Sequence, residues 1–244
     1  MRQFGLVGKS LSHSFSKIYF EEKFRREQIS DAAYSLFELA DIQEIIPFSQ
    51  QHPDLVGFNV TIPYKQTVIP YLDALSDEAA AVQAVNTVLI QRTGDRLLAK
   101  GFNTDIIGFR QSLQGFGIPE RALVLGTGGA ASAVTHVLEG LGCRCTAVSR
   151  DKKRGLPYSS LTTETIRRHR LIVNCTPLGT FPDIHKKPDI PYEGISGEHF
   201  LYDLVYNPAE TAFLKEGVHR GAKVLNGLPM LHAQAEAAWR LWNS

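Results

Sequence analysis

Short apolar runs alternate with helical repeats along the first half of the chain. Apolar runs of four to eight residues predict strands, and apolar positions spaced three or four apart predict helices. A glycine-containing turn at 93–95 between two apolar runs predicts a hairpin over 86–100. Mixed strand directions are therefore expected. The predicted strands are 4–8, 33–39 and 55–61, and the predicted helices are 14–26, a short one at 42–46, 64–72 and 76–84.

From residue 121 onward the alternation becomes a regular strand–helix–strand pattern. Such a pattern predicts a parallel sheet that is covered by helices on both faces. The proline-rich stretch 181–197 has little periodicity and is predicted to be a loop. The predicted strands are 121–126, 144–149, 169–176, 199–206 and 222–227, and the predicted helices are 128–141, 211–217 and an Ala-rich one at 229–242.

The amino-acid composition narrows the classes of protein to which the chain could belong. The 244 residues are 43% hydrophobic, which suffices for packed cores, and two lobes fit this length better than one. Twenty-six basic residues against 25 acidic ones leave a net charge of +1, so no global field favours nucleic acid or an anionic membrane. No apolar run approaches the ~20 residues that span a bilayer, and no signal peptide is evident. The three cysteines predict neither a disulfide framework nor a zinc site. We expect a soluble cytoplasmic protein.

A glycine-rich loop follows the predicted strand 121–126 and opens a helix. Gly126, Gly128 and the small residue Ala131 match GxGxx(G/A), in which the glycines allow a tight turn and close approach to pyrophosphate. The amides of the following helix then face the phosphates. Glycine-rich turns also occur for steric reasons alone, but here the loop has the required strand on each side.

The end of the next predicted strand indicates which dinucleotide binds. An NAD site places Asp or Glu there for the ribose 2′-hydroxyl, whereas an NADP site offers Arg. Here Arg150 stands at the strand end and Arg154 one helical turn further, which favours NADP. Asp151 lies between them and is the residue that an NAD site would use.

Polar residues gather at predicted strand ends in the first half. Asn59, Thr61 and Lys65 run from a buried strand into a helix start, and Asp105 stands at a second such junction. Each is consistent with an ordinary helix cap or a surface residue. Together they form the polar rim expected of a small-molecule site, with Lys65 as a candidate acid–base group.

Nine motifs, in order along nearly the whole chain, resemble those of the shikimate dehydrogenase family, including its quinate/shikimate members. Any one is a modest signal, whereas nine in the family's order are specific. They are SHSFS (12–16), NVTIPYK (59–65), AVNT (84–87), NTDIIGF (103–109), GTGGAA (126–131), SRDKKR (149–154), NCTPLG (174–179), YDLVY (202–206) and NGLPMLHAQA (226–235).

The resemblance implies an α/β fold of two lobes. One is a mixed-sheet substrate-binding and catalytic domain, 1–103 plus 228–244, to which the C-terminal helix returns. The other is a Rossmann-like parallel-sheet NADP-binding domain, 104–227.

The resemblance also implies roles residue by residue, with no metal ion. Lys65 and Asp105 correspond to the catalytic pair. The substrate-binding positions are Ser14, Ser16, Asn59, Thr61, Asn86, Tyr206 and Gln234. The cofactor-binding positions are Gly126, Gly128, Gly129, Ala130, Ser149, Arg150, Arg154, Thr176, Leu204 and Gly227.

The implied activity is reversible NADPH-dependent reduction of 3-dehydroshikimate to shikimate, in the biosynthesis of chorismate and the aromatic amino acids, by a monomer or homodimer. The alternatives are an NAD-preferring quinate/shikimate dehydrogenase and a nucleotide-binding regulator without turnover. Retention of Lys65, Asp105, Asn86 and Gln234 together argues against the regulator.

Overall fold

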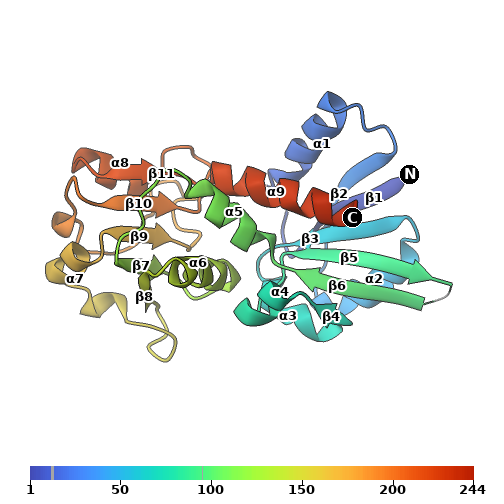
Figure 1. Ribbon diagram of the computed structural model, residues 1–244, viewed down its shortest axis with the longest axis horizontal. Coiled ribbons are helices and arrows are strands. Elements are labelled where there is room, and N and C mark those ends of the chain that lie inside the picture. The colour runs from blue at the N-terminus through green and yellow to red at the C-terminus, as the bar shows by residue number, and fades with distance from the viewer. Residues whose placement is uncertain (12–13, 95) are drawn as a thin grey trace. The chain divides into compact units, whose positions relative to one another are not determined.

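The computed structural model describes residues 1–11, 14–94 and 96–244. The chain divides into two compact units (Figure 1): the first is Met1–Ile107 with Gln234–Ser244, and the second is Gly108–Ala233. Ser12 and His13 of the predicted serine motif, and Asp95 of the predicted turn, lie outside the described residues.

The first unit is built on a mixed sheet, as predicted. Its six strands run in the order β2-β1-β3-β5-β6-β4. β1 is parallel to β2 and β3, whereas β5 is antiparallel to β3 and β6. The two-residue β4 was not predicted, because so short a strand has no alternation to detect. The strands are β1 (Arg2–Gly8), β2 (Ala32–Glu38), β3 (Leu55–Val60), β4 (Ala74–Leu75), β5 (Thr87–Thr93) and β6 (Arg96–Phe102).

The helices of this unit lie at the predicted positions, but two predicted helices are divided. The predicted short helix over 42–46 is instead the 3-10 segment η1 (Ile42–Glu44) followed by α2 (Ile45–Gln51). The predicted helix over 64–72 is instead α3 (Tyr64–Thr67) followed by the 3-10 segment η2 (Ile69–Tyr71), which has Pro70 in its first turn. Proline lacks the N–H that a continuing α-helix needs. The others are α1 (Ser16–Arg26), α4 (Asp77–Val82) and the C-terminal α9 (Leu228–Trp242).

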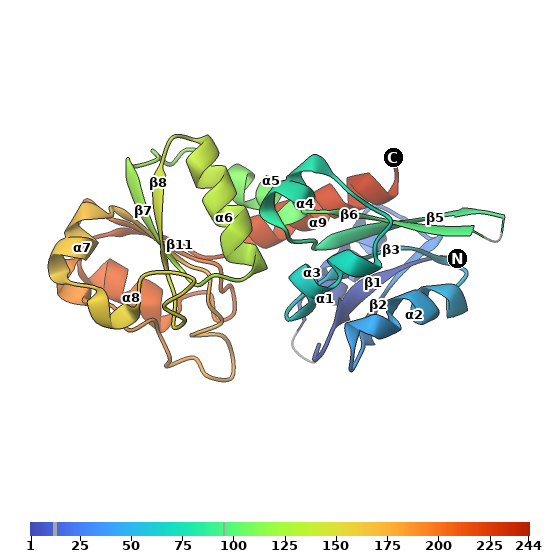
Figure 2. The same cartoon turned by 90° about the horizontal axis from the view of Figure 1, so that it is seen from below.

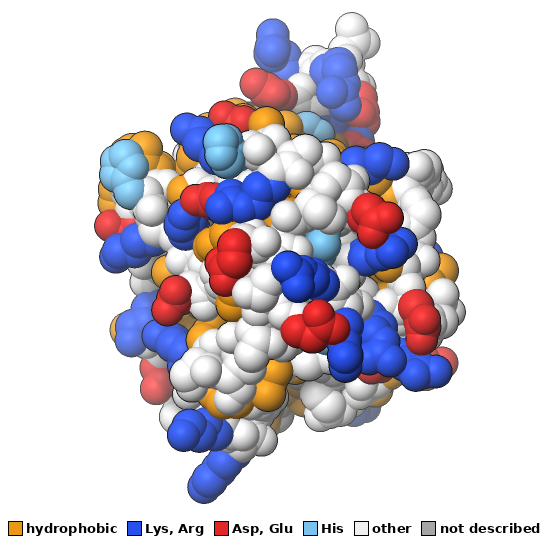
Figure 3. All heavy atoms as spheres, turned by 90° about the vertical axis from the view of Figure 1, so that its left-hand side faces the viewer, with side chains coloured by type: hydrophobic (Ala, Val, Ile, Leu, Met, Phe, Trp, Pro, Cys, Tyr) orange, Lys and Arg blue, Asp and Glu red, His pale blue; other side chains and the backbone are white. Residues whose placement is uncertain are grey.

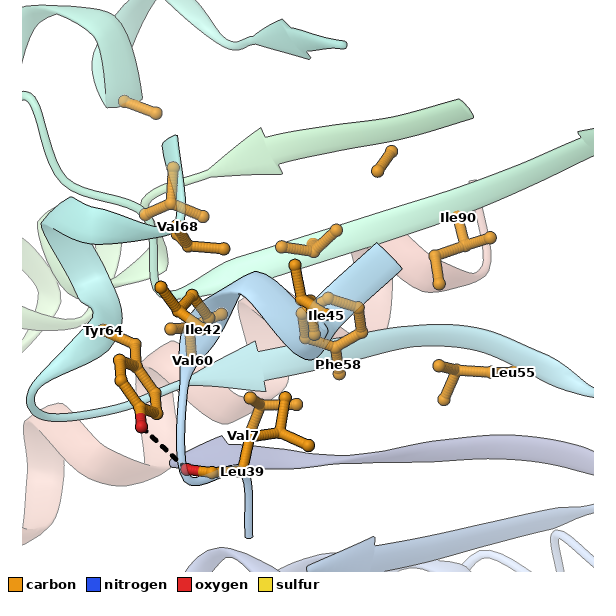
Figure 4. Close-up of a cluster of buried hydrophobic side chains, with 14 residues drawn as sticks. Val7, Leu39, Ile42, Ile45, Leu55, Phe58, Val60, Tyr64, Val68 and Ile90 are labelled. Atoms are coloured by element: carbon orange, nitrogen blue, oxygen red, sulfur yellow. Dashed lines mark hydrogen bonds between the residues drawn. The ribbon is translucent and has the colours of Figure 1, made fainter. Parts of the chain in front are cut away.

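Both faces of the first sheet are buried. Helices α2, α3 and α4 cover one face, where Phe58 and Val60 of β3 pack with Ile45 and Tyr64 (Figure 4). The Tyr64 hydroxyl donates to the Leu39 carbonyl oxygen at 2.7 Å, the dashed line in that figure. The other face is covered by α1 and α9 through an aromatic cluster that includes Phe4, Phe20, Phe24, Tyr34 and Trp242. The lysine-bearing end of α3 is therefore anchored on a packed core.

The second unit is a parallel sheet in the order β11-β10-β9-β7-β8, as the alternating pattern predicted. The six-residue α7 was missed, although Thr162 and Thr165 form a capping box that marks its start. The strands are β7 (Arg121–Leu125), β8 (Arg144–Val148), β9 (Leu171–Asn174), β10 (Phe200–Asp203) and β11 (Lys223–Leu225), and the helices are α6 (Gly129–Gly140), η3 (Tyr158–Ser160), α7 (Thr163–Arg168), η4 (Tyr192–Gly194) and α8 (Ala212–His219). The boundary between the units falls within α5 (Thr104–Ser112), whose first four residues belong to the first unit.

Helices lie on both faces of the second sheet, and α6 and α8 are on opposite sides in Figure 2. The direction of chain progression reverses between β7 and β9. In open α/β sheets, ligands bind beyond the carboxyl ends of the strands at such a switch point. The glycine-rich loop after β7 and the NCTPLG motif after β9 both lie there.

The distribution of surface charge agrees with the near-neutral net charge of the sequence. On the face that Figure 3 presents, Lys and Arg side chains lie among Asp and Glu side chains instead of forming one basic patch. Among the helices that the structure describes, none is long and apolar enough to cross a membrane. Within the same residues, no group of three or more His, Cys, Asp or Glu side chains is placed to hold a metal ion.

Candidate active site and nucleotide-binding loops

A buried lysine–carboxylate pair lies in the first unit. Lys65 on α3 donates from Nζ to Oδ2 of Asp105, in the first turn of α5, at 2.6 Å, and their side chains are 17% and 7% exposed. The Asn86 amide donates to the other oxygen of Asp105 at 2.8 Å. The amino end of α5 also favours a negative charge at this position. Asp105 is therefore held as an acceptor on both oxygens, and it orients the Lys65 ammonium group.

Asn86, between the predicted hairpin and the Ala-rich helix, is the centre of a polar cluster around this pair. Its Oδ1 accepts from the Thr104 N–H at 2.7 Å and from the hydroxyls of Thr104 at 3.1 Å and Thr87 at 3.2 Å. Gln234 Oε1 accepts from the Asn86 amide and the Thr104 hydroxyl, both at 3.4 Å. Gln234 reaches this cluster because α9 packs on the sheet of the first unit. Three of the predicted site residues are thus brought together with Lys65.

The hydrogen bonds of the Asn59 side chain support the backbone at Asn86. Its Oδ1 accepts from the Tyr34 hydroxyl at 2.8 Å, and its Nδ2 donates to the Thr87 hydroxyl at 3.0 Å and to the Asn86 carbonyl at 3.2 Å. Only 5% of the residue is exposed. Both amide hydrogens are used within the unit, where they tie β3 to the start of β5. A substrate contact through Asn59 stays a prediction, whereas its support of Asn86 follows directly from these bonds.

Ser14, Ser16 and Thr61 precede or begin helices, and of these three described residues only Ser14 satisfies a helix-start N–H. Ser16 is the first residue of α1, whose N-cap is Phe15, and the Ser14 hydroxyl accepts from the Ser16 N–H at 3.3 Å. The N-cap of α3 is Pro63 rather than Thr61. The capping interpretation therefore accounts for Ser14 but not for Ser16 or Thr61.

In the second unit, the loop between β7 and α6 fits a pyrophosphate. Gly126 has φ +112°, a backbone conformation that favours glycine. Gly128 is the N-cap of α6 with no side-chain cap hydrogen bond, and a Cβ there would meet no described atom within 4 Å. The first-turn N–H groups of α6, from Gly129 and Ala130 onward, are therefore available to an anion.

The loop after β8 carries two arginines, and one of them, Arg154, contacts this glycine loop. Arg150 and Arg154 are exposed, and Arg154 donates to the Thr127 carbonyl at 2.5 Å. Ser149 Oγ accepts from the Asp151 N–H at 3.1 Å, and the Asp151 carboxylate accepts from the N–H two residues on at 3.0 Å. Asp151 therefore stabilises its own turn, while the arginines carry the charge that a 2′-phosphate needs.

Three predicted cofactor residues lie at successive strand ends of the second sheet. Thr176 follows β9, and its hydroxyl donates to Asn174 Oδ1 at 2.6 Å. Leu204 follows β10, and its N–H donates to the Asn174 carbonyl at 3.0 Å. Gly227 follows β11, and a Cβ there would lie 2.1 Å from the Leu204 carbonyl oxygen, so only glycine fits. Tyr206 is two residues beyond Leu204 in the same unit.

The chain was compared with known families and curated proteins. The profile of the shikimate dehydrogenase substrate binding domain matches residues 6–88. A shikimate dehydrogenase (NADP(+)) of Caldicellulosiruptor saccharolyticus is 36% identical over 262 residues, which cover 99% of this chain and 92% of that protein. The chain belongs to the shikimate dehydrogenase family.

Solved members of the shikimate dehydrogenase family share the fold. Shikimate 5-dehydrogenase of Thermus thermophilus, in complex with NADP(H) and shikimate, matches with a TM-score of 0.85 and 34% identity over 99% of this chain and 93% of that one. Quinate dehydrogenase of Corynebacterium glutamicum, in complex with NAD, matches with a TM-score of 0.86 and 26% identity over the same shares. Fold similarity alone therefore does not decide the substrate or the cofactor.

Some members of these polar networks were not singled out from the sequence. Thr87 and Thr104 join Asn86 to Gln234, and both stand inside the family motifs AVNT and NTDIIGF. Asn174 and Asp203 support the strand ends of the second unit and stand in NCTPLG and YDLVY. Their place in shikimate dehydrogenase motifs was a signal, but which of the motif residues are buried and bonded required coordinates.

Proposed function

We propose that this protein interconverts shikimate and 3-dehydroshikimate as an NADP-dependent oxidoreductase. The observation that carries the proposal is the buried Lys65–Asp105 pair with Asn86 and Gln234 around it. It occurs in a chain that aligns over 99% of its length with a shikimate dehydrogenase (NADP(+)). A regulator without turnover would not need a lysine and a carboxylate held together in this way.

Lys65 serves as the acid–base group in this proposal. When the alcohol is oxidised, the uncharged amine of Lys65 accepts the hydroxyl proton at Nζ and becomes an ammonium group; in the reverse direction this ammonium group returns the proton. Asp105 accepts one N–H of Lys65 and so directs Nζ toward the reacting oxygen. When bound, NADP⁺ supplies the hydride acceptor.

The remaining residues of the proposal bind the substrate by hydrogen bonds. The hydroxyls of Ser14, Ser16 and Thr61 in the first unit donate to the carboxylate, and the amides of Asn86 and Gln234 bind ring hydroxyls. Asn86 and Gln234 are 3% and 9% exposed. An analogue that lacks one ring hydroxyl leaves such a buried group unpaired, so the pocket rejects it.

For the cofactor, we propose NADP. The Gly126–Ala130 loop is expected to hold the pyrophosphate, with Ser149, Arg150 and Arg154 around the 2′-phosphate and Thr176, Leu204 and Gly227 at the nicotinamide end. Engagement of Asp151 in its own turn supports NADP over NAD. The second unit is thereby the nucleotide domain and the first unit the substrate domain.

For its setting, we propose the cytoplasm and a monomer or homodimer. In a reducing compartment the three cysteines of the chain, Cys143, Cys145 and Cys175, would remain thiols. Sedimentation of the purified protein measures the oligomeric state, and species larger than a dimer would contradict this part of the proposal.

The test is nicotinamide absorbance with shikimate or quinate and NADP⁺ or NAD⁺ in all four combinations. Turnover with shikimate and NADP⁺ that exceeds the other pairs is the expected result. Faster turnover with quinate or NAD⁺ would transfer the assignment to the quinate/shikimate type. Folded protein that is inactive with every pair would leave the regulator as the better interpretation.

A further inference from the structure

A buried carboxylate at the end of β10 has no role in the reaction as proposed above. Asp203 is fully buried. Its Oδ1 accepts from the Asn174 amide at 2.9 Å and from the Val205 N–H at 3.0 Å, and its Oδ2 accepts from the Thr211 hydroxyl at 2.5 Å. Asp203 thus joins the end of β9, the chain after β10 and the N-cap of α8. Strands β9 and β10 lie side by side in Figure 1.

The bond from Asn174 extends this network to Thr176. Asn174 and Asp203 are register partners in the parallel pair β9–β10. Asn174 Nδ2 points to Asp203, so its Oδ1 is directed to the following loop, where it accepts from the N–H and the hydroxyl of Thr176 at 3.1 and 2.6 Å. If Asp203 is removed, the Asn174 amide keeps only its longer bond to the Leu178 carbonyl, at 3.4 Å, so its orientation is held less firmly and Thr176 loses a fixed partner.

The same carboxylate holds the backbone that carries Leu204. Val205 N–H donates to Asp203, and Leu204 N–H donates to the Asn174 carbonyl at 3.0 Å, so Leu204 lies between two fixed peptide groups. The Val205 carbonyl in turn accepts from the Gly227 N–H at 3.1 Å. The three residues assigned to the nicotinamide end are therefore within two hydrogen bonds of one carboxylate.

A carboxylate suits this position because its three partners all donate. An ionised Asp has only acceptor oxygens, whereas an aliphatic side chain would leave two side-chain donors and one N–H unpaired in a dry environment. Burial raises the pKa of Asp203 to about 6, against the lowering effect of these three hydrogen bonds. The group therefore costs stability when it is ionised, and packing alone does not explain it.

We propose that Asp203 is a positioning residue for hydride transfer, which sets Thr176 through Asn174 and sets Leu204 through the backbone. The proposal rests on the proposed function, because that function places these residues beside the nicotinamide.

The experiment compares three variants of the full-length enzyme. Asp203→Ala removes every contact. Asp203→Asn keeps an Oδ1 acceptor for Asn174 and Val205 and turns its amide nitrogen toward the Thr211 hydroxyl, which can accept. Tyr202→Phe is the matched control, since Tyr202 is the preceding residue of β10, equally buried, and loses one hydrogen bond, to Ser112, on the other side of the strand.

Two quantities are measured for each variant. The first is kcat with saturating 3-dehydroshikimate and NADPH. The second is the competitive inhibition constant of 2′-phospho-ADP-ribose, the part of NADP without nicotinamide. For Asp203→Ala, we expect kcat to fall by about tenfold or more and the inhibition constant to change less than about twofold. Asp203→Asn and Tyr202→Phe are expected to stay within about threefold of the wild type in both quantities.

Three results for these variants would contradict the proposed role of Asp203. A kcat of Asp203→Ala near the wild-type value overturns the proposal. So does an inhibition constant that rises in parallel with the loss of kcat, because the carboxylate then supports the whole unit and not the nicotinamide end. An Asp203→Asn variant as impaired as Asp203→Ala overturns the assigned contacts. If the wild type itself neither turns over nor binds the fragment, the proposed function has failed, and this failure is separate from the behaviour of the variants.

Discussion

At the scale of single residues, Lys65 is the proposed proton carrier. Its Nζ donates to Asp105 at 2.6 Å, and its side chain is 17% exposed, so the residue is not sealed off from a ligand. We expect Lys65→Ala to lower kcat by about 10²- to 10⁴-fold, the usual contribution of a general acid–base group, and to weaken shikimate binding much less. Steady-state kinetics and equilibrium binding measure the two effects. A variant with near-normal turnover would refute the role.

The choice between NADP and NAD is proposed to depend on Arg150. This residue is exposed after β8, so its replacement should leave the core unchanged. We expect Arg150→Ala to raise the KM for NADPH by about tenfold, since a charge-assisted bond is lost, and to leave the KM for NADH nearly unchanged. Lys152→Ala, in the same exposed turn, is the control. Equal changes for the two cofactors would show that Arg150 does not bind the 2′-phosphate.

Asp203 also predicts a dependence of stability on pH. Its folded pKa of about 6 exceeds the unfolded value of 3.8 because burial disfavours the ionised form, and its described partners Asn174, Thr211 and the Val205 N–H are uncharged. The folded state therefore binds more protons between these values, and this group lowers the free energy of unfolding as pH rises from about 4 to about 6.

Asp203→Asn removes that contribution. The free energy of unfolding of the variant minus that of the wild type is therefore expected to increase by up to about 3 kcal/mol between pH 4 and pH 7. Urea unfolding at the two pH values measures this difference. A difference that is independent of pH would contradict the raised pKa.

At the scale of elements, helix α9 covers one face of the sheet in the first unit and contributes Trp242 to its core. Trp242 is 4% exposed, donates to the Val88 carbonyl at 3.0 Å and stacks on Phe4 with ring centroids 4.9 Å apart. Gly57 allows this packing, since a Cβ there would lie 2.3 Å from the indole nitrogen. The register of α9 on the sheet also sets where Gln234 meets Asn86.

We therefore expect Trp242→Ala to lower the free energy of unfolding by about 3–5 kcal/mol, through the cavity that it leaves. The KM for shikimate should rise as well, because Gln234 loses its support. Denaturant unfolding and kinetics measure these effects. Arg240→Ala, at an exposed position of the same helix, should stay within about 0.5 kcal/mol. A loss of stability without any change in KM would show that the packing of α9 does not support the substrate site.

At the scale of the whole molecule, the two units are expected to bind different ligands. Hydrogen exchange with 2′-phospho-ADP-ribose should protect amides of the β7–α6 loop and of the turn after β8, in the second unit. Shikimate should protect amides near Ser16, Lys65 and Asp105, in the first unit. Protection of only one unit by both ligands would contradict the proposed division of labour.

The sequence by itself determined the elements and the chemistry available at their ends. Local hydrophobic periodicity is a property of neighbouring residues, so the mixed and parallel sheets were predictable, as was the position of the glycine loop. The short elements β4 and α7 have no periodicity and were not predicted. The break before Pro70 has a signal in the sequence, the proline itself, which outweighs the helical spacing of the apolar residues around it.

Only the tertiary structure decided which polar groups are already paired. Asn59 and Asn86 are both asparagines at strand ends, yet the amide hydrogens of Asn59 are both used to support the first unit, while Asn86 joins Asp105 to Gln234. Asp203, an ordinary motif residue in the sequence, is buried among three donors. The physical reason is that burial and hydrogen-bond satisfaction depend on residues far apart in the chain, which only the packed fold brings together.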